Sequence, residues 1–92
     1  MEFDITNLKY VKVPTIVLFD KDISSTAKLL MGFITTLSMQ DGFCYASNNY
    51  FSRHMKVSKR TITNCITSLK KKKYIRIENE LSIRRIYLEN LF

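Results

Sequence analysis

The sequence predicts an α+β fold in which three helices precede a β-hairpin. The prediction depends most on residues 46–78, which read ASNNYFSRHMKVSKRTITNCITSLKKKKYIRIE. Ser47 and Ser58 each stand directly before a helical pattern, where a serine hydroxyl caps the first turn, and only Lys56-Val57 separates the two patterns. The second pattern leads into the alternating run YIRIE, which is typical of a strand. Two helices joined by a tight turn and followed by a hairpin form a winged helix-turn-helix.

Two further elements are predicted upstream of this stretch. Residues 10–13 alternate between apolar and polar side chains and stop at Pro14, so we expect a short N-terminal strand at the edge of a sheet. Ser24 or Ser25 then caps a helix that runs to about Met39.

The apolar residues of this upstream helix form one stripe at helical spacing, made of Leu30, Phe33, Ile34 and Leu37. Leu29 and Met31 fall beside the stripe, so the apolar surface is wider than one face. We expect a helix of this kind to be central to the fold or shared with a second subunit.

The two helices of the central motif are predicted at residues 48–55 and at residues 59 to about 72. Tyr50, Phe51 and Met55 of the first are expected to face the core. In the second, apolar side chains recur at i, i+3, i+4 and i+7, at Ile62, Cys65, Ile66 and Leu69. This spacing places all four on one inner face.

The wing is predicted at residues 74–88. Residues 74–78 form its first strand, Asn79-Glu80 its turn, and residues 81–88 the returning strand. Within the returning strand the apolar side chains change from odd to even positions. A β-bulge reverses the direction of the side chains that follow it, so we expect a bulge near Arg84-Arg85.

Composition limits the classes of protein that fit. Ninety-two residues with 46% hydrophobic content predict one folded domain over residues 1–92, with the helix-turn-helix at about 47–72 and the wing at about 74–88. No apolar run is long enough to cross a bilayer and the start is unlike a signal peptide, so we expect a cytoplasmic protein without membrane contact. Cys44 and Cys65 are expected to be reduced thiols.

The pattern of reactive side chains argues against an enzyme. The sequence shows no paired carboxylates, phosphate loop, metal-ligand cluster or nucleophile with a base at suitable spacing. We therefore expect no catalytic residues, no metal site and no cofactor.

The net charge of +7 is concentrated in one part of the chain. The stretch from Arg53 to Arg76 holds nine Lys or Arg and no Asp or Glu, whereas residues 1–52 hold four basic and five acidic residues. Such a focused positive patch suits a polyanion such as nucleic acid, although a run of lysines can also be a solvated surface.

The order of elements, together with certain phrases, resembles a known family. The phrases are KYVKVP, SSTAKLLMGFITTLS, GFCYASNNYFSRHMKVSKRTI and KKYIRIE. They are similar to the winged helix-turn-helix domain at the N-terminus of plasmid and phage replication initiators and replisome organisers of low-GC Gram-positive bacteria, over about residues 9–88. The resemblance implies that Ser58, Lys59, Arg60 and Thr61 begin the recognition helix. Many relatives carry Gly in the turn where this chain has Lys56, which then needs a left-handed backbone.

The candidate DNA-binding residues follow from the helical phase. If the stripe of the last helix faces the core, the opposite face carries Arg60, Thr63, Asn64, Thr67 and Lys71. Arg pairs with guanine, Asn with adenine, and Thr contacts the thymine methyl group or a phosphate. With the helix start these make the candidate recognition set Ser58, Lys59, Arg60, Thr61, Thr63, Asn64, Thr67 and Lys71. The candidate contacts of the wing and flanks are Arg53, Lys56, Lys73, Arg76, Arg84 and Arg85.

The favoured hypothesis is a sequence-specific double-stranded DNA-binding protein of a plasmid or phage. It would mark an origin, of replication or of conjugative transfer, for larger machinery such as replication or relaxosome proteins. A small transcriptional regulator and a winged-helix module that binds protein are the alternatives. A homodimer is a further hypothesis, with Leu29, Met31 and Leu91-Phe92 as candidate contacts.

Overall fold

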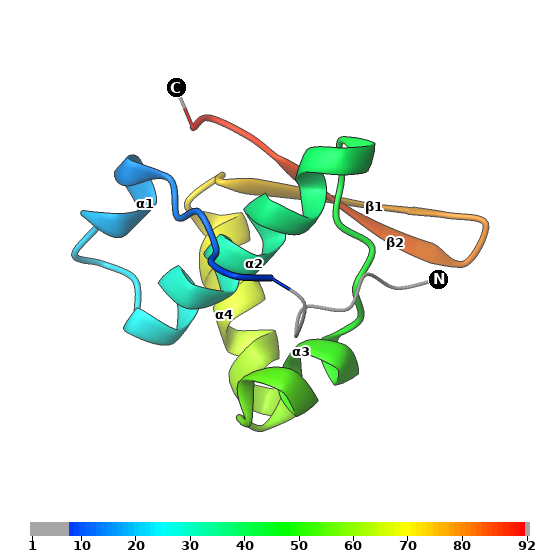
Figure 1. Ribbon diagram of the computed structural model, residues 1–92, viewed down its shortest axis with the longest axis horizontal. Coiled ribbons are helices and arrows are strands. Elements are labelled where there is room, and N and C mark those ends of the chain that lie inside the picture. The colour runs from blue at the N-terminus through cyan, green and yellow to red at the C-terminus, as the bar shows by residue number, and fades with distance from the viewer. Residues whose placement is uncertain (1–7, 92) are drawn as a thin grey trace.

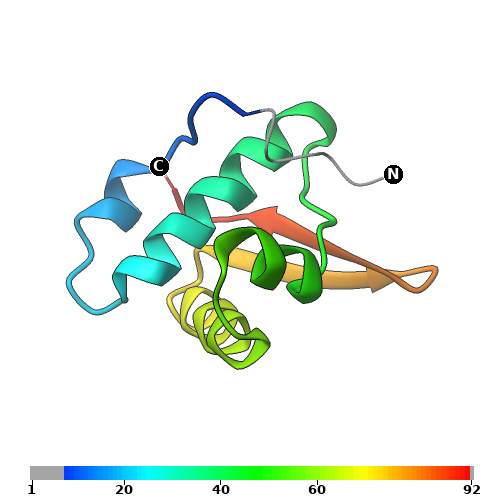
Figure 2. The ribbon, with the colours of Figure 1, turned by 60° about the horizontal axis from the view of Figure 1, so that its bottom comes forward.

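The computed structural model describes residues 8–91 and has four helices and one two-stranded antiparallel sheet over that range. The elements are α1 (Thr15–Leu18), α2 (Ser25–Asp41), α3 (Asn48–Met55), α4 (Lys59–Lys71), β1 (Ile75–Glu80) and β2 (Ile83–Leu88). The helices pack together, and the hairpin of β1 and β2 extends to one side of them (Figures 1 and 2). The predicted α+β class with a C-terminal hairpin is confirmed.

Helix α2 begins and ends at local capping signals and lies at the centre of the fold. The Ser24 hydroxyl accepts a hydrogen bond from the amide of Ala27 at 3.1 Å, and Gly42 ends the helix in a left-handed conformation at φ 82°. Leu30, Ile34 and Leu37 of the predicted stripe are buried, and Phe33 is partly buried. They face the core that α2 shares with α4 and with β2.

The two apolar residues beside the α2 stripe, Leu29 and Met31, differ in exposure. The Met31 side chain is fully buried, so its predicted role in a contact with a second subunit is wrong. The Leu29 side chain is 54% exposed. Phe92 lies outside the described residues.

The turn between α3 and α4 has the predicted length and strain. Ser47 and Ser58 cap α3 and α4 by accepting from the amides three residues on, each at 3.0 Å. Lys56 adopts the left-handed conformation, φ 58° and ψ 43°, which a residue with a Cβ enters at some cost. The Ser52 hydroxyl donates to the carbonyl of Val57 at 2.6 Å and so closes the turn from the α3 side.

The stripe of α4 is buried as predicted. Ile62, Cys65, Ile66 and Leu69 are each at most 6% exposed. Phe51 of α3 is fully buried and Tyr50 is nearly so, while Met55 packs at the edge of the core. This burial fixes the rotation of α4 about its axis, because turning the helix would expose the stripe. Cys44 is also buried, at 1% exposure, and neither cysteine is in a disulfide.

The predicted N-terminal strand is wrong. Residues 10–13 are not a strand; they lie along α2, where the amide of Lys12 donates to the Thr36 hydroxyl at 2.9 Å. Gly32 permits this approach, because a Cβ at its position would lie 2.9 Å from a methyl group of Val13. A strand needs a partner for its amides, and here a side chain of α2 takes one of them. Pro14 precedes the short helix α1, which was not predicted, and Val17 of α1 is fully buried.

The hairpin has a different turn from the predicted one and no bulge. Pairing runs without interruption from Ile75 opposite Leu88 to Glu80 opposite Ile83. The turn is Leu81-Ser82, with φ 52° and 66°, and two residues at positive φ are what a tight hairpin favours. The odd-numbered apolar residues lie outside the core instead: Leu81 is in the turn and 88% exposed, and Ile83 is 49% exposed on the face of β2 opposite buried Ile86. The predicted bulge near Arg84-Arg85 is therefore wrong.

Cys44 extends the sheet by a single bridge. Its amide donates to the carbonyl of Ile86 at 2.9 Å and its carbonyl accepts from the amide of Ile86 at 2.8 Å. This bridge ties the segment between α2 and α3 to the wing. It therefore places the start of α3 beside β2.

Candidate nucleic-acid interface

The predicted reading face is exposed along α4. The side chains of Arg60, Thr63, Asn64, Thr67 and Lys71 all face solvent, opposite the buried stripe. Helix α4 contains no acidic residue. Such a face combines base-reading side chains with a cation and offers no negative charge to repel phosphates.

The first turn of α4 holds residues with different tasks. Ser58 accepts from the amide of Thr61, and the two hydroxyl groups share a hydrogen bond of 2.9 Å. These two residues of the predicted recognition set therefore cap the helix. Lys59, also in the first turn, is exposed.

Six basic side chains lie in two groups at the ends of the reading face, and Lys71 belongs both to the face and to one group. Arg53, Lys56 and Lys59 lie around the turn, and Lys70, Lys71 and Lys73 lie at the end of α4; all are exposed. Within residues 8–91 none of the six is held in an ion pair. The end of a helix favours cations through the macrodipole, so the second group is compatible with the helix as well as with phosphates.

Lys72 differs from the lysines beside it. Its ammonium group lies 2.8 Å from a carboxylate oxygen of Asp22 and 3.3 Å from one of Asp20, in the loop between α1 and α2. The hydroxyl of Tyr74 donates to Asp20 at 2.6 Å. This hydrogen bond, with help from Lys72, holds the pKa of the Asp20 carboxyl below its usual value. The cluster fastens the end of α4 to the α1–α2 loop and engages the charge of Lys72 within the protein.

Arg84 of the wing is bound inside the protein. Its two terminal nitrogens donate to the side-chain oxygen of Asn48 and to the carbonyl of Ala46, each at 2.6 Å. Burial lowers the pKa of its guanidinium. The side-chain nitrogen of Asn48 in turn donates to the hydroxyl of Thr63 on α4 at 3.4 Å. A chain of polar contacts thus joins the wing to the reading face through the first residue of α3.

The other two wing arginines also have partners in the protein. Arg76 pairs with Glu78 and with Glu89, the latter at 2.6 Å, and stacks on the ring of Tyr87. Arg85 lies 3.4 Å from Glu80 and 4.6 Å from the centre of the Phe43 ring. Contact of these arginines with DNA stays a prediction, but each would have to share or leave its present partner.

Sequence reasoning missed the polar residues that position this surface. Asn48 and Ser52 carry hydrogen bonds to residues 15 and 5 positions away, and Asp20 bonds Tyr74 across 54 positions. The only signal in the sequence is polarity within an apolar pattern, and polarity does not reveal the partner. Among the described residues, no cluster of His, Cys, Asp or Glu could hold a metal ion, and no helix is long and apolar enough to span a bilayer.

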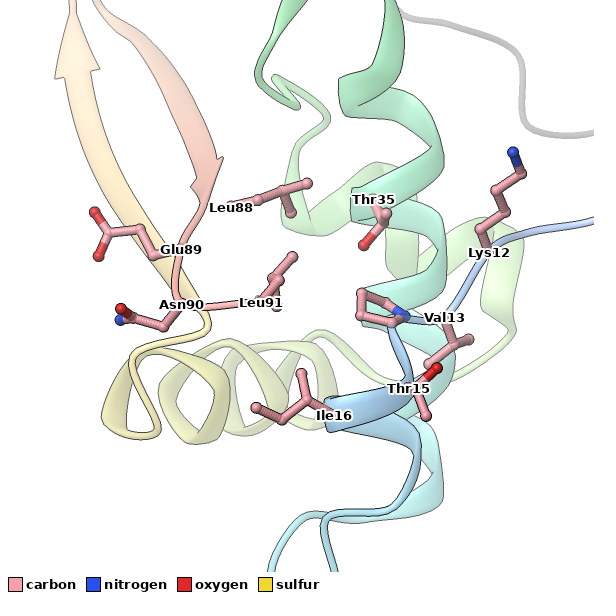
Figure 3. A pocket seen from close by; sticks show the side chains of 10 residues that line it. Lys12, Val13, Thr15, Ile16, Thr35, Leu88, Glu89, Asn90 and Leu91 are labelled. Atoms are coloured by element: carbon pink, nitrogen blue, oxygen red, sulfur yellow. The ribbon is translucent and has the colours of Figure 1, made fainter.

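One concave feature of the surface lies apart from the predicted DNA-binding residues. It is a groove of about 530 Å³ between the chain that enters α1, helix α2 and the end of β2 (Figure 3). Its walls are mostly apolar and include Val13, Ile16, Leu88 and Leu91. None of the candidate DNA-binding residues lines it.

Comparison with known proteins agrees with this geometry. The search of curated proteins found no match, and neither did the search of solved structures. One family model, described as a helix-turn-helix domain, matches residues 21–75. The matched residues run from the loop before α2 to the first residue of β1 and make up more than half of the chain. The chain therefore belongs to the helix-turn-helix domain family, a family of DNA-binding domains.

Proposed function

We propose that the protein binds double-stranded DNA sequence-specifically, with α4 in the major groove. The observation that carries this proposal is the exposed, acid-free face of α4. On it Arg60 and Asn64 are exposed, and within residues 8–91 the side chain of neither makes a hydrogen bond or an ion pair. Arg reads guanine and Asn reads adenine through paired hydrogen bonds. Side chains without a hydrogen-bond partner in the protein are the ones best suited to bind bases.

The basic frame supports a large electrostatic contribution. Arg53, Lys56 and Lys59 on one side and Lys70, Lys71 and Lys73 on the other are spaced so that phosphates could be held at both ends of α4. Neutralising about six phosphates gives a slope of log K against log salt of roughly −5.

Base reading by α4 is favoured over the alternative in which Arg76, Arg84 and Arg85 of the wing read the bases. All three wing arginines are engaged, Arg84 with Asn48 and Ala46 and the others with carboxylates and rings. A base contact from the wing would have to replace charge-assisted bonds already made. The wing then positions α4 and contributes contacts to the DNA backbone.

For the biological role we propose a protein of a plasmid or phage that marks an origin of replication or of transfer. Support comes from the resemblance of ASNNYF and VSKRTI to the replication-initiator domain. Replication or relaxosome proteins would then be its partners. A transcriptional regulator is the alternative within DNA binding, and a protein-binding module is the alternative outside it. The strongly basic face of α4 disfavours the protein-binding module.

Two copies acting on paired sites form part of the proposal. A single small module discriminates few base pairs, and α1 presents apolar surface beside the groove of Figure 3. Ile16, which lines the groove, is 47% exposed, and Phe19, at the end of the same helix, is 72% exposed. Sedimentation with and without a duplex tests this, and Phe19→Ser should reduce the dimer.

The central experiment is selection of bound duplexes from a random pool, followed by affinity for the selected site and for a scrambled duplex across salt concentrations. Arg60→Ala and Asn64→Ala should each cost about 1–3 kcal/mol on the selected site and relax preference at one or two positions. Lys9→Ala, an exposed cation on the segment over α2, is the matched control and should change little. A flat salt response, or an unchanged ratio between selected and scrambled sites in both variants, would refute the proposal.

A further inference from the structure

The two threonines in the middle of the reading face have their hydroxyl hydrogens already in use. The Thr63 hydroxyl donates to the carbonyl of Lys59 at 3.0 Å, and the Thr67 hydroxyl donates to the carbonyl of Thr63 at 2.9 Å. Both bonds run back one turn along α4, as threonine hydroxyls in helices often do. Both residues are nevertheless exposed.

A hydroxyl bound to its own helix cannot at the same time donate to DNA. A threonine that holds a phosphate or a base acceptor by donation would first have to give up this bond. Its methyl group has no competing task. The apolar group that a major groove offers to such a methyl is the C5-methyl of thymine.

We propose that Thr63 and Thr67 are specificity-determining residues that select thymine through methyl contacts. This inference rests on the proposed binding of α4 in the major groove. The two residues are one helical turn apart, a rise of about 6 Å along α4. At about 3.4 Å per base pair, the thymines they select lie within roughly two base-pair steps of each other.

Neighbouring contacts fix the orientation of Thr63 further. Asn48 donates to its hydroxyl oxygen at 3.4 Å, and Arg84 holds the side-chain oxygen of Asn48 at 2.6 Å. The nitrogen of Asn48 is therefore the group turned toward Thr63. The Thr63 hydroxyl thus has partners on two sides, α3 and its own helix, and this favours the rotamer in which the methyl stays free. Among residues 8–91, Thr67 has only the bond within its helix, so Thr63 is expected to be the more selective of the two.

The test combines base analogues with paired substitutions. The probes are the selected duplex and a series in which each thymine in turn is replaced by uracil, which lacks only the methyl group. At the contacted positions the wild-type protein should bind the uracil duplex about fourfold more weakly, the factor expected from leaving one methyl-sized group unburied. Elsewhere the replacement should have no effect.

The substitutions separate the methyl from the hydroxyl. Thr63→Val and Thr67→Val keep a methyl and remove the hydroxyl, so they should retain the uracil penalty. Thr63→Ser and Thr67→Ser keep the hydroxyl and remove the methyl, so each should abolish the penalty at one position. Circular dichroism confirms that each variant is folded. The series of uracil duplexes measured with the wild-type protein tests the inference without any substitution.

Two results would overturn the inference. One is wild-type binding that uracil weakens at no position; the other is a penalty that survives in the serine variants and disappears in the valine variants. In both results salt-dependent binding to the selected duplex would persist, so the proposed function would stand. Absence of that binding would instead refute the proposed function together with this inference.

Discussion

Removing the side chain of Arg84 should destabilise the protein more than it weakens DNA binding. Arg84→Ala deletes two hydrogen bonds of 2.6 Å, to the side chain of Asn48 and to the carbonyl of Ala46. Ala46 is 5% exposed, so water can replace the lost partner of its carbonyl only after some rearrangement. The contact between the wing and the start of α3 is lost with these bonds.

The size of the effect follows from the number and kind of bonds. A hydrogen bond to a charged group contributes about 1.5–3 kcal/mol, and Arg84 is only partly buried, so solvent recovers part of that. We expect the free energy of unfolding to fall by about 2–4 kcal/mol. For a domain of this size that corresponds to a drop in Tm of roughly 10–25 °C.

The assay is thermal and urea unfolding of Arg84→Ala, Arg84→Lys and Arg53→Ala beside the wild type. Arg84→Lys keeps the charge but loses the two-pronged geometry, so it should be intermediate. Arg53→Ala removes an exposed arginine and should leave Tm nearly unchanged while weakening DNA binding. If Arg84→Ala unfolds at the wild-type temperature and only loses DNA affinity, Arg84 is a DNA contact and the structural role argued above is wrong.

Three further predictions concern acid stability, the wing turn and a buried thiol. The hydrogen bond from the Tyr74 hydroxyl lowers the pKa of the Asp20 carboxyl, so the stabilisation it gives is present above the usual Asp pKa of about 3.9 and is lost as pH falls through the lower folded-state pKa. Tyr74→Phe should therefore reduce the loss of stability that urea unfolding measures between about pH 5 and pH 2. An unchanged dependence of stability on pH would contradict this. Leu81→Asn combined with Ser82→Gly supplies the residues that tolerate positive φ, so Tm should rise by a few degrees, and a fall would show that Leu81 makes a stabilising contact. Burial raises the pKa of the Cys65 thiol, so at pH 8 this thiol should react slowly with a disulfide reagent in the folded protein and fast in denaturant. Equal rates in the two states would refute the core position of Cys65.

Local signals in the sequence were sufficient for the helix-turn-helix and for the composition of its outer face. Ser47 and Ser58 cap their helices because a hydroxyl reaches an amide only three residues away. The stripe from Ile62 to Leu69 and the acid-free face opposite follow from a period of 3.6 residues. These features depend on residues within one or two helical turns, so they can be predicted from the local sequence alone.

Contacts between distant residues decided the rest. Residues 10–13 have a strand pattern, but a strand forms only beside a partner, and the segment packs on α2 at Gly32 instead. The register of the hairpin depended on which residues take positive φ and on burying Ile86, neither of which parity alone reveals.

The same reason separates two kinds of candidate site residue. Arg60 and Asn64 could be placed from helical phase alone, since solvent exposure on a helix is a local consequence of its buried face. The tasks of Arg84 and Lys72 could not, because each is set by a partner 36 to 52 positions away. The sequence gives the charge and the hydrogen-bonding groups of a side chain. Only the tertiary structure decides whether those groups bind a partner within the protein or stay available to a ligand.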